Sequence, residues 1–135
     1  MKTPDLFIAD RCFVGKMLIK GIYQTGKRRL IRDNTERSDE LTLRREYGNK
    51  YDEFAVAVYD RYDNKIGYLE KNENEETAFY MDKGQECVAV VADIDKKSAT
   101  VGIMVDVFCL TDKENMQKLK AEFEEHLKTS LFDTI

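Results

Sequence analysis

The chain has 135 residues with 42% hydrophobic content, which is enough for one domain with a buried core and too short for two comfortable ones. Charged residues make up 36% and the net charge is -4, so the molecule as a whole repels polyanions and nonspecific nucleic-acid binding is disfavoured. Three cysteines without a CxxC pair and a single histidine argue against a zinc site, and we expect neither a metal nor a cofactor.

The sequence shows no sign of a membrane span or an export signal. No segment approaches the roughly 18 consecutive apolar residues that a spanning helix requires. The apolar patch at residues 6–9 is cut off by Asp10 and Arg11, so the apolar core of a signal peptide is missing. Widely spaced cysteines suit a reducing compartment, and we expect a cytoplasmic protein with no membrane partner.

The first forty residues hold one clear strand and much polar sequence. Residues 1–14 fit a packed arm, an edge strand or a short helix, and the pattern leaves all three open. Residues 17–23 predict a strand in which Gly21 marks a bulge or a barrel bend. Residues 24–39 predict a long loop or hairpin with a short strand near Leu30 and Ile31.

Residues 40–69 predict three strands of one sheet, joined through an unusual corner. Alternating apolar residues mark runs around Leu43, around Val58 and over residues 66–69. The corner at residues 47–52 carries two tyrosines, an asparagine, a lysine and an aspartate, whereas an ordinary connection needs only about two to five turn residues. A solvated loop, in which the asparagine and the aspartate bond to their own backbone, is the simple structural explanation.

Past residue 69 the sequence predicts a short helix and a hairpin. Asn72 and Asn74 offer caps for a helix over residues 75–81, and Gly84 is its stop signal. Two alternating runs between residues 86 and 106 predict a β-hairpin.

Residues 111–135 predict one amphipathic helix. Thr111 and Glu114 have capping-box spacing, and apolar residues then follow at intervals of three or four. This apolar stripe consists of Met116, Leu119, Phe123 and Leu127. Because the stripe must be covered by the barrel or by a second copy of the chain, a homodimer through this helix is one expectation. We assign residues 1–110 to a β-barrel domain and residues 111–135 to a helical extension of the same domain.

Together these elements predict a mainly β fold with added helices. The expected architecture is a small, partly closed β-barrel of about six strands, with one short helix inserted and one C-terminal amphipathic helix. No catalytic constellation accompanies it: His126 is alone on a charged helix, and neither a GxSxG motif nor a phosphate-binding loop occurs. We therefore expect no intrinsic enzymatic activity, and a small hydrolase is the weakest alternative.

The corner and its flanking strands carry an ordered set of residues that matches a known family pattern. The set reads Leu41-x-Leu43-x-Arg45-Glu46-x-x-Asn49-x-Tyr51-Asp52-x-x-Ala55-Val56-x-Val58, then Ile66-Gly67-Tyr68-Leu69. It resembles the signature of the HIRAN domain, a module found on the N-terminal side of certain SNF-type DNA translocases and also alone in bacterial proteins. The resemblance covers roughly residues 16–108 and implies an OB-like barrel.

The resemblance also implies an activity, the capture of a single-stranded DNA 3′ end. Asn49, Tyr51 and Asp52 match the family's corner motif, with Asp52 placed to bond a terminal hydroxyl and Tyr51 to stack on a base. Lys71 matches a phosphate-contacting position and Phe108 a base-contacting aromatic position. A helicase or nuclease partner is a further implication.

Two more tyrosines complete the predicted site, and several positions depart from the family pattern. Tyr68 adds an aromatic ring near the corner, and Tyr23 stands with Gln24 where the family has basic and aromatic binding residues. Tyr47 and Lys50 replace the prolines that usually flank the asparagine, and Phe54 replaces an asparagine. Lost prolines loosen the corner, so we expect weak or altered binding.

Each predicted site residue also has a structural explanation. Tyr51 fits a core aromatic at the barrel end, and Asp52 fits a cap for the following strand. Lys71 fits surface decoration, and Phe108 fits a core position.

Two functions therefore stay open. The first is a non-catalytic module that binds single-stranded nucleic acid, and the second is a protein-interaction or scaffolding module that pairs through its C-terminal helix. An exposed basic groove at the corner favours the first function, whereas a buried corner favours the second. Arg45 and Glu46, at the start of the corner, are interpreted as a structural ion pair across the sheet.

Overall fold

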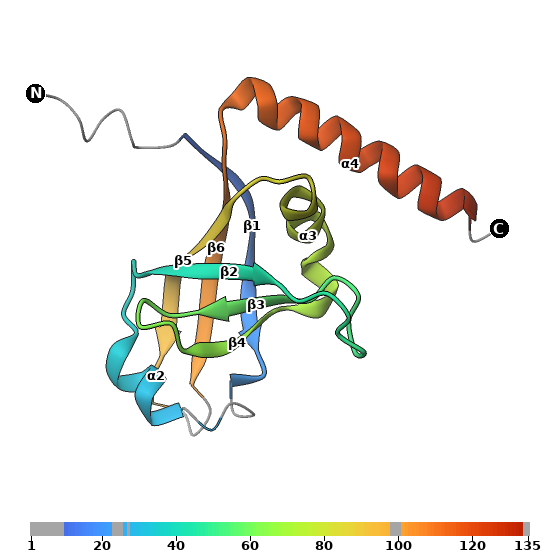
Figure 1. Cartoon of the computed structure of the whole chain (residues 1–135). Helices are drawn as coiled ribbons and strands as arrows, with labels where there is room; N and C mark the ends of the chain where they lie inside the picture. Colours follow the sequence, from blue (N-terminus) through green and yellow to red (C-terminus); the bar gives the residue numbers. More distant parts are fainter. Residues whose placement is uncertain (1–9, 23–25, 27, 98–100, 134–135) are drawn as a thin grey trace, which may run out of the picture.

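A closed antiparallel barrel forms the body of the protein (Figure 1). The computed structural model describes residues 10–22, 26, 28–97 and 101–133. In these ranges the strand order around the barrel is β1-β4-β3-β2-β5-β6. The strands are β1 (Arg11–Lys20), β2 (Glu40–Arg45), β3 (Val56–Tyr59), β4 (Lys65–Leu69), β5 (Cys87–Asp95) and β6 (Gly102–Leu110).

Strand β1 closes the barrel with two seams of very different length. Its pairing with β6 runs from Arg11 to Leu18, interrupted by a register shift between Phe13 and Gly15. Its pairing with β4 consists of Ile19 with Leu69 and Lys20 with Tyr68. The predicted six-stranded barrel is confirmed, and it closes fully because β1 bonds on both sides.

Alternation of side chains explains which face of each strand lines the core. Along β6 every second residue is buried, and Ile103, Val105, Val107 and Cys109 are completely inaccessible to solvent. Such period-2 burial follows from the pleat, which points successive side chains to opposite faces of a sheet. The apolar interior of the barrel therefore stabilises the fold.

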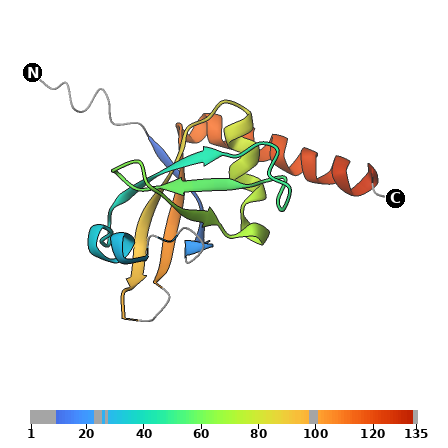
Figure 2. The ribbon, with the colours of Figure 1, turned by 60° about the horizontal axis from the view of Figure 1, so that its bottom comes forward.

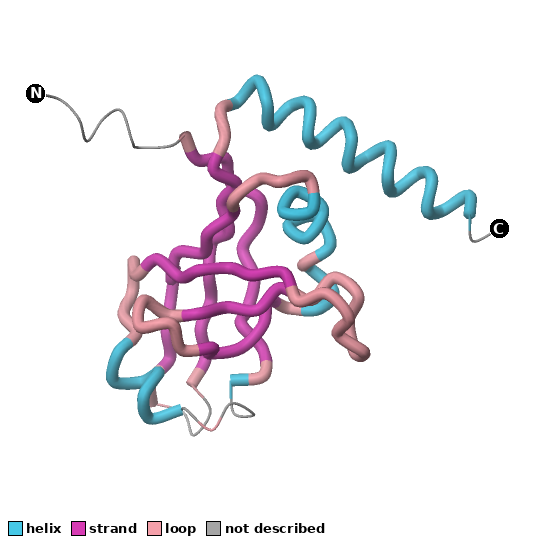
Figure 3. The backbone as a smooth tube through the Cα atoms, viewed as in Figure 1, coloured by secondary structure: helices cyan, strands magenta, loops and turns pink. Residues whose placement is uncertain are grey.

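Helical segments lie on the outside of the barrel (Figure 3). Helix α2 lies at one end, and α3 and α4 lie at the other (Figures 1 and 2). The segments are α2 (Arg28–Asn34), the 3-10 turn η2 (Lys71–Glu73), α3 (Glu75–Asp82) and α4 (Lys113–Asp133).

Helix α2 corrects the prediction of a loop or short strand near Leu30 and Ile31. Ile31 and Thr35 are both buried, and the amide of Thr35 donates to the carbonyl of Ile31 at 3.0 Å. Residues four apart lie on one face of a helix, so this short segment buries one side without the alternation of a strand. The predicted strand at residues 17–23 is also shifted, since β1 starts at Arg11 and ends at Lys20.

The predicted C-terminal helix is confirmed, with a different cap. Asp112, and not Thr111, accepts the hydrogen bond from the backbone amide of Asn115, at 2.8 Å. Met116 and Leu119 are buried against the barrel. The end of α4 extends past the barrel in Figures 1 and 2.

Gly67 in β4 lies against the last residues of β1. Its φ angle is 158°, and a Cβ atom at this position would lie 2.6 Å from the carbonyl oxygen of Lys20 and 2.7 Å from Cγ2 of Ile19. Both distances are shorter than any van der Waals contact allows, and one neighbour is backbone. The absent side chain is therefore what lets β1 and β4 meet.

Gly67→Ala is expected to lower the free energy of unfolding by about 1–3 kcal/mol, because the added methyl group forces the β1–β4 seam apart. Urea unfolding followed by circular dichroism measures this change. Gly15→Ala is the matched control, since the nearest atom to its Cβ would be Cε of Met17 at 3.5 Å. Equal stability of the two variants would contradict the role assigned to Gly67.

Candidate functional site

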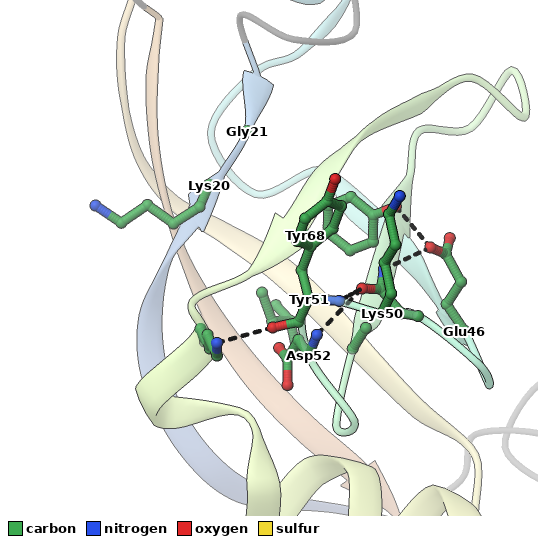
Figure 4. A pocket seen from close by; sticks show the side chains of 11 residues that line it. Lys20, Gly21, Glu46, Lys50, Tyr51, Asp52 and Tyr68 are labelled. Atoms are coloured by element: carbon green, nitrogen blue, oxygen red, sulfur yellow. Dashed lines mark hydrogen bonds between the residues drawn. The ribbon is translucent and has the colours of Figure 1, made fainter.

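A cleft of about 980 Å³ opens between the β2–β3 corner and the end of β1 (Figure 4). Lys20 and Gly21 lie on one wall, and the corner residues lie opposite them. The cleft is lined by Lys20, Gly21, Glu46, Asn49, Lys50, Tyr51, Asp52, Ala55, Tyr68, Leu69 and Lys71. Five residues predicted from the sequence therefore come together here: Asn49, Tyr51, Asp52, Tyr68 and Lys71.

The side-chain amide of Asn49 organises the corner. Its Oδ1 accepts hydrogen bonds from the backbone amides of Tyr51 and Asp52, at 2.9 and 3.1 Å. Its Nδ2 donates to Oε1 of Glu46 at 2.9 Å. The corner thus has the Asx-type turn that the simple structural explanation predicts, and the same turn brings the motif residues to the cleft.

Tyr51 projects into solvent and is not a core residue. Its side chain is 74% exposed, which excludes the interpretation of Tyr51 as a barrel-closing aromatic. Lys50 Nζ lies 5.2 Å from the centre of its ring, within the range of a cation–π contact. Lys71 Nζ donates to the carbonyl oxygen of Tyr51 at 2.8 Å. The exposed ring of Tyr51 therefore has one ammonium group beside it, and a second ammonium group bonds the Tyr51 backbone.

Asp52 is half-buried and bonded through both carboxylate oxygens. Oδ1 accepts the backbone amide of Phe54 at 2.9 Å, and Oδ2 accepts Nδ2 of Asn74 at 2.8 Å. The first bond is the cap before β3 that the structural explanation predicts. A carboxylate has about four acceptor sites, so Asp52 keeps capacity to accept from a ligand hydroxyl.

The carboxylate of Glu46 links the corner to two side chains of β4. Lys65 Nζ donates to its Oε2 at 2.7 Å, and the Tyr68 hydroxyl donates to its Oε1 at 2.7 Å. Burial alone raises the pKa of Glu46, but the hydrogen bonds from Lys65, Tyr68 and Asn49 outweigh it and lower that pKa below its usual value. Glu46 therefore stays ionised and holds the Tyr68 ring at the edge of the cleft.

The predicted ion pair between Arg45 and Glu46 is wrong. Arg45 bonds Asp82 of α3 instead, with Nε donating to Oδ1 at 2.9 Å, and the Tyr47 hydroxyl donates to the same carboxylate oxygen at 2.6 Å. Consecutive residues at the end of a strand point to opposite faces, so the two neighbours meet different partners.

The cleft is locally cationic although the chain is acidic. Three lysines line it against two carboxylates, and Lys65 already neutralises one of these, Glu46. The Lys20 side chain extends away from the corner in Figure 4. The sequence around Lys20 does not mark it as a site residue, because Lys20 lines the cleft only through the long-range pairing of β1 with β4.

One predicted residue, Phe108, does not line the cleft. Phe108 lies on β6 beside Phe13, with ring centres 5.9 Å apart. Phe13 precedes Lys20 by seven positions on β1, which at about 3.3 Å per residue places it about 23 Å along the strand from the cleft. Tyr23 and Gln24 lie outside the described residues.

The part of the chain that the structure describes holds neither a metal-binding cluster nor a membrane-spanning helix. No group of three or more His, Cys, Asp and Glu side chains is arranged there to hold a metal ion. Within the same ranges no helix has the length and apolar character to span a bilayer.

Comparison with known proteins identifies a family and a shared fold. A sequence model of the HIRAN domain matches residues 18–109. A protein from Lactobacillus plantarum has a similar structure, with a TM-score of 0.70 and 21% identity over 76% of this chain and 98% of that chain. The HIRAN domain of human HLTF gives a TM-score of 0.62 and 20% identity over 86% and 92% of the two chains.

The HLTF HIRAN domain has also been solved in a DNA-bound conformation. This structure gives a TM-score of 0.53 at 20% identity and covers 87% of this chain and 92% of that chain. No curated protein sequence matches the chain significantly. At such identities the structural likeness shows the fold alone.

Glu46→Gln is expected to lower the free energy of unfolding by about 0.5–1 kcal/mol at pH 7, a modest value because both Glu46 and Lys65 are one-third exposed. Because folding lowers the pKa of Glu46, its contribution is present above the ordinary value of 4.5 and is lost as pH falls through the lower folded value. Urea unfolding at several pH values should therefore show the two proteins converging in acid. Glu124→Gln, at an exposed position of α4, serves as the control. A difference that persists at pH 2 would contradict the assignment.

Proposed function

Because the chain belongs to the HIRAN domain family, we propose that it is a non-catalytic module that binds single-stranded nucleic acid, in particular a DNA 3′ end, in the cleft beside the β2–β3 corner. The observation that carries the proposal is the exposed Tyr51 ring at the edge of a cleft with three lysines. Exposed aromatic rings next to ammonium groups are the usual means of binding unpaired bases and their phosphates.

Three side chains have distinct roles in this proposal. Tyr51 stacks on the last base, because its ring is open to solvent. Lys71 reaches a phosphate from the segment that follows β4, while its tie to the Tyr51 carbonyl keeps it at the cleft. Asp52 accepts a hydrogen bond from a terminal hydroxyl, and its charge disfavours a phosphate at the same place.

The departures from the family pattern are consistent with binding. Lys50 replaces a proline, but the two hydrogen bonds to Asn49 Oδ1 still fix the backbone of the corner. Lys50 also adds a positive charge beside the Tyr51 ring. The replacement of proline by Lys50 therefore leaves the corner held by hydrogen bonds and adds electrostatic attraction for phosphates.

A module that only binds a DNA end needs a second activity to act on that end. We include a helicase or nuclease partner in the proposal for this reason, and such a pair would serve DNA repair. The DNA-bound conformation of the HLTF HIRAN domain supports the DNA part of the proposal by analogy.

Tyr51→Ala is expected to weaken binding of a short single-stranded DNA by about 5- to 150-fold, the equivalent of about 1–3 kcal/mol for one stacked base. Fluorescence anisotropy at low salt measures the affinity. Tyr62→Ala is the matched control, because Tyr62 is also exposed (57%) and its ring centre lies 5.1 Å from Cζ of Arg61. Tyr62 does not line the cleft.

The wild-type protein should also distinguish strand ends and respond to salt. A strand ending in a 3′-hydroxyl should bind more tightly than the same strand ending in a 3′-phosphate.

Affinity should fall with salt at a log–log slope of about -2, as expected for roughly three phosphate contacts. Absence of binding at about 50 μM protein in low salt would refute the proposal, since even nonspecific binding is commonly stronger than about 100 μM.

A second candidate function, pairing through α4, follows from the end of that helix. Leu127 and Leu131 are 41% and 63% exposed and continue the stripe of the buried residues Met116 and Leu119. Because those two buried residues join the barrel core, we propose that residues 111–135 are an extension of the barrel domain and that the exposed part of α4 around Leu127 pairs with a second copy. This candidate describes an interaction module.

Replacing both Leu127 and Leu131 with glutamate should convert a dimer to a monomer, because four charges would then face one another across the paired helices. Light scattering at micromolar concentrations measures the mass. Ala121→Glu with Thr129→Glu adds the same charge at exposed positions elsewhere on α4 and should leave the dimer intact. A monomeric wild-type protein would end this second candidate.

A further inference from the structure

Asn74 connects the start of α3 to the corner that bears Asp52. Its side chain is completely buried. Its Nδ2 donates two hydrogen bonds, to Oδ2 of Asp52 at 2.8 Å and to the carbonyl oxygen of Phe54 at 2.9 Å. One buried amide thus holds both the carboxylate at the cleft and the backbone that leads into β3.

The chemistry of the neighbours fixes which way the Asn74 amide points. Asp52 Oδ2 and the Phe54 carbonyl are both acceptors, so only the NH₂ group of Asn74 can face them. Asn74 Oδ1 then has no hydrogen-bond partner among the described residues. An asparagine before a helix ordinarily uses this oxygen to cap the first turn, yet Asn74 makes no such bond to α3. Asn74 therefore does not cap its own helix, and its side chain bonds Asp52 instead.

The two bonds to Asp52 determine the orientation of its carboxylate. The Phe54 amide holds Oδ1 and Asn74 holds Oδ2, so rotation of the group would break one bond or both. Both donors are neutral groups, a backbone amide and a side-chain amide. A carboxylate held in this way has fixed directions for its unused lone pairs, and a hydroxyl that arrives there meets an acceptor that is already oriented.

We propose that Asn74 is a positioning residue that holds the Asp52 carboxylate for recognition of a terminal hydroxyl, and so sets the preference of the cleft for hydroxyl-ended over phosphate-ended strands. The inference rests on the proposed nucleic-acid function. Asn74 does not line the cleft, and it acts on a ligand only through Asp52.

Helix α3 also holds the other end of the corner, which makes a purely structural role the competing explanation. Asp82, at the last turn of α3, bonds Arg45 and Tyr47. Loss of α3 would therefore disturb the whole corner, and the test must separate loss of the helix from loss of the Asp52 contact.

The experiment compares wild type, Asn74→Ala and Asn74→Ser for binding of two short DNA strands that differ only in a 3′-hydroxyl or a 3′-phosphate. Serine is a good helix cap but too short to make the amide's two bonds, so Asn74→Ser keeps α3 and releases Asp52. Both variants should lose the preference for the hydroxyl end by about 10-fold or more, the effect of one hydrogen bond with a charged group. Affinity for the phosphate end should change little, because Lys71 and Tyr51 are intact.

Ala78→Gly is the matched control for a weakened α3. Ala78 is completely buried in the same helix and does not line the cleft, so glycine weakens the helix without touching Asp52. Thermal unfolding measures the stability of each variant. Even when Ala78→Gly is destabilised as much as the Asn74 variants, it should keep the wild-type preference for the hydroxyl end.

The outcomes separate the inference from the function on which it rests. If folded Asn74→Ser keeps the wild-type preference, or if Ala78→Gly loses it equally, Asn74 has only a structural role. If wild type binds both strands equally, Asp52 does not recognise the terminus, and the inference fails while nucleic-acid binding stands. If wild type binds neither strand, both fail.

Discussion

The short seam between β1 and β4 is the constraint on which both the fold and the cleft depend. Two residue pairs close the barrel there, and the missing side chain of Gly67 lets the strands come close enough to form them. The same pairs place Lys20 opposite Tyr68 and bring the end of β1 in front of the corner. The pairing that closes the barrel therefore also places Lys20 and Gly21 in one wall of the cleft. The other wall is the ten-residue connection between β2 and β3.

Local pairing of charges explains how an acidic chain presents a cationic cleft. Glu46 is bonded by Lys65, and Asp82 is bonded by Arg45, so these carboxylates oppose the lysines of the cleft only weakly. Acidic side chains on the exposed surface of α4 contribute negative charge outside the cleft; they are Glu122, Glu124 and Glu125. The sign of the net charge is consequently a poor guide to the charge of the cleft, which depends on the side chains that line it.

The strands and the corner were predictable because their signals are local. Alternation identifies β2, β5 and β6, and the motif around Asn49 identifies five residues that the cleft brings together. Helix α2 was missed because a seven-residue segment that buries only Ile31 has too little periodicity to distinguish it from a loop. Lys20 was not predicted because it lines the cleft only through the pairing of β1 with β4, and Asn74 was not singled out because it contacts Asp52, which lies 22 positions earlier in the chain. Asn74 looked like an ordinary helix cap, and only its distance to Asp52 shows where its amide is used.

The amide of Asn49, which shapes the corner, does not titrate and carries no charge. The two backbone hydrogen bonds that Asn49 accepts therefore do not depend directly on acidity or salt, whereas the attraction of the lysines for a polyanion weakens as counterions accumulate. The backbone bonds to Asn49 and the attraction of the lysines for anions consequently respond to different solution conditions. A change in salt concentration therefore alters the electrostatic attraction of the cleft and leaves these backbone bonds in place.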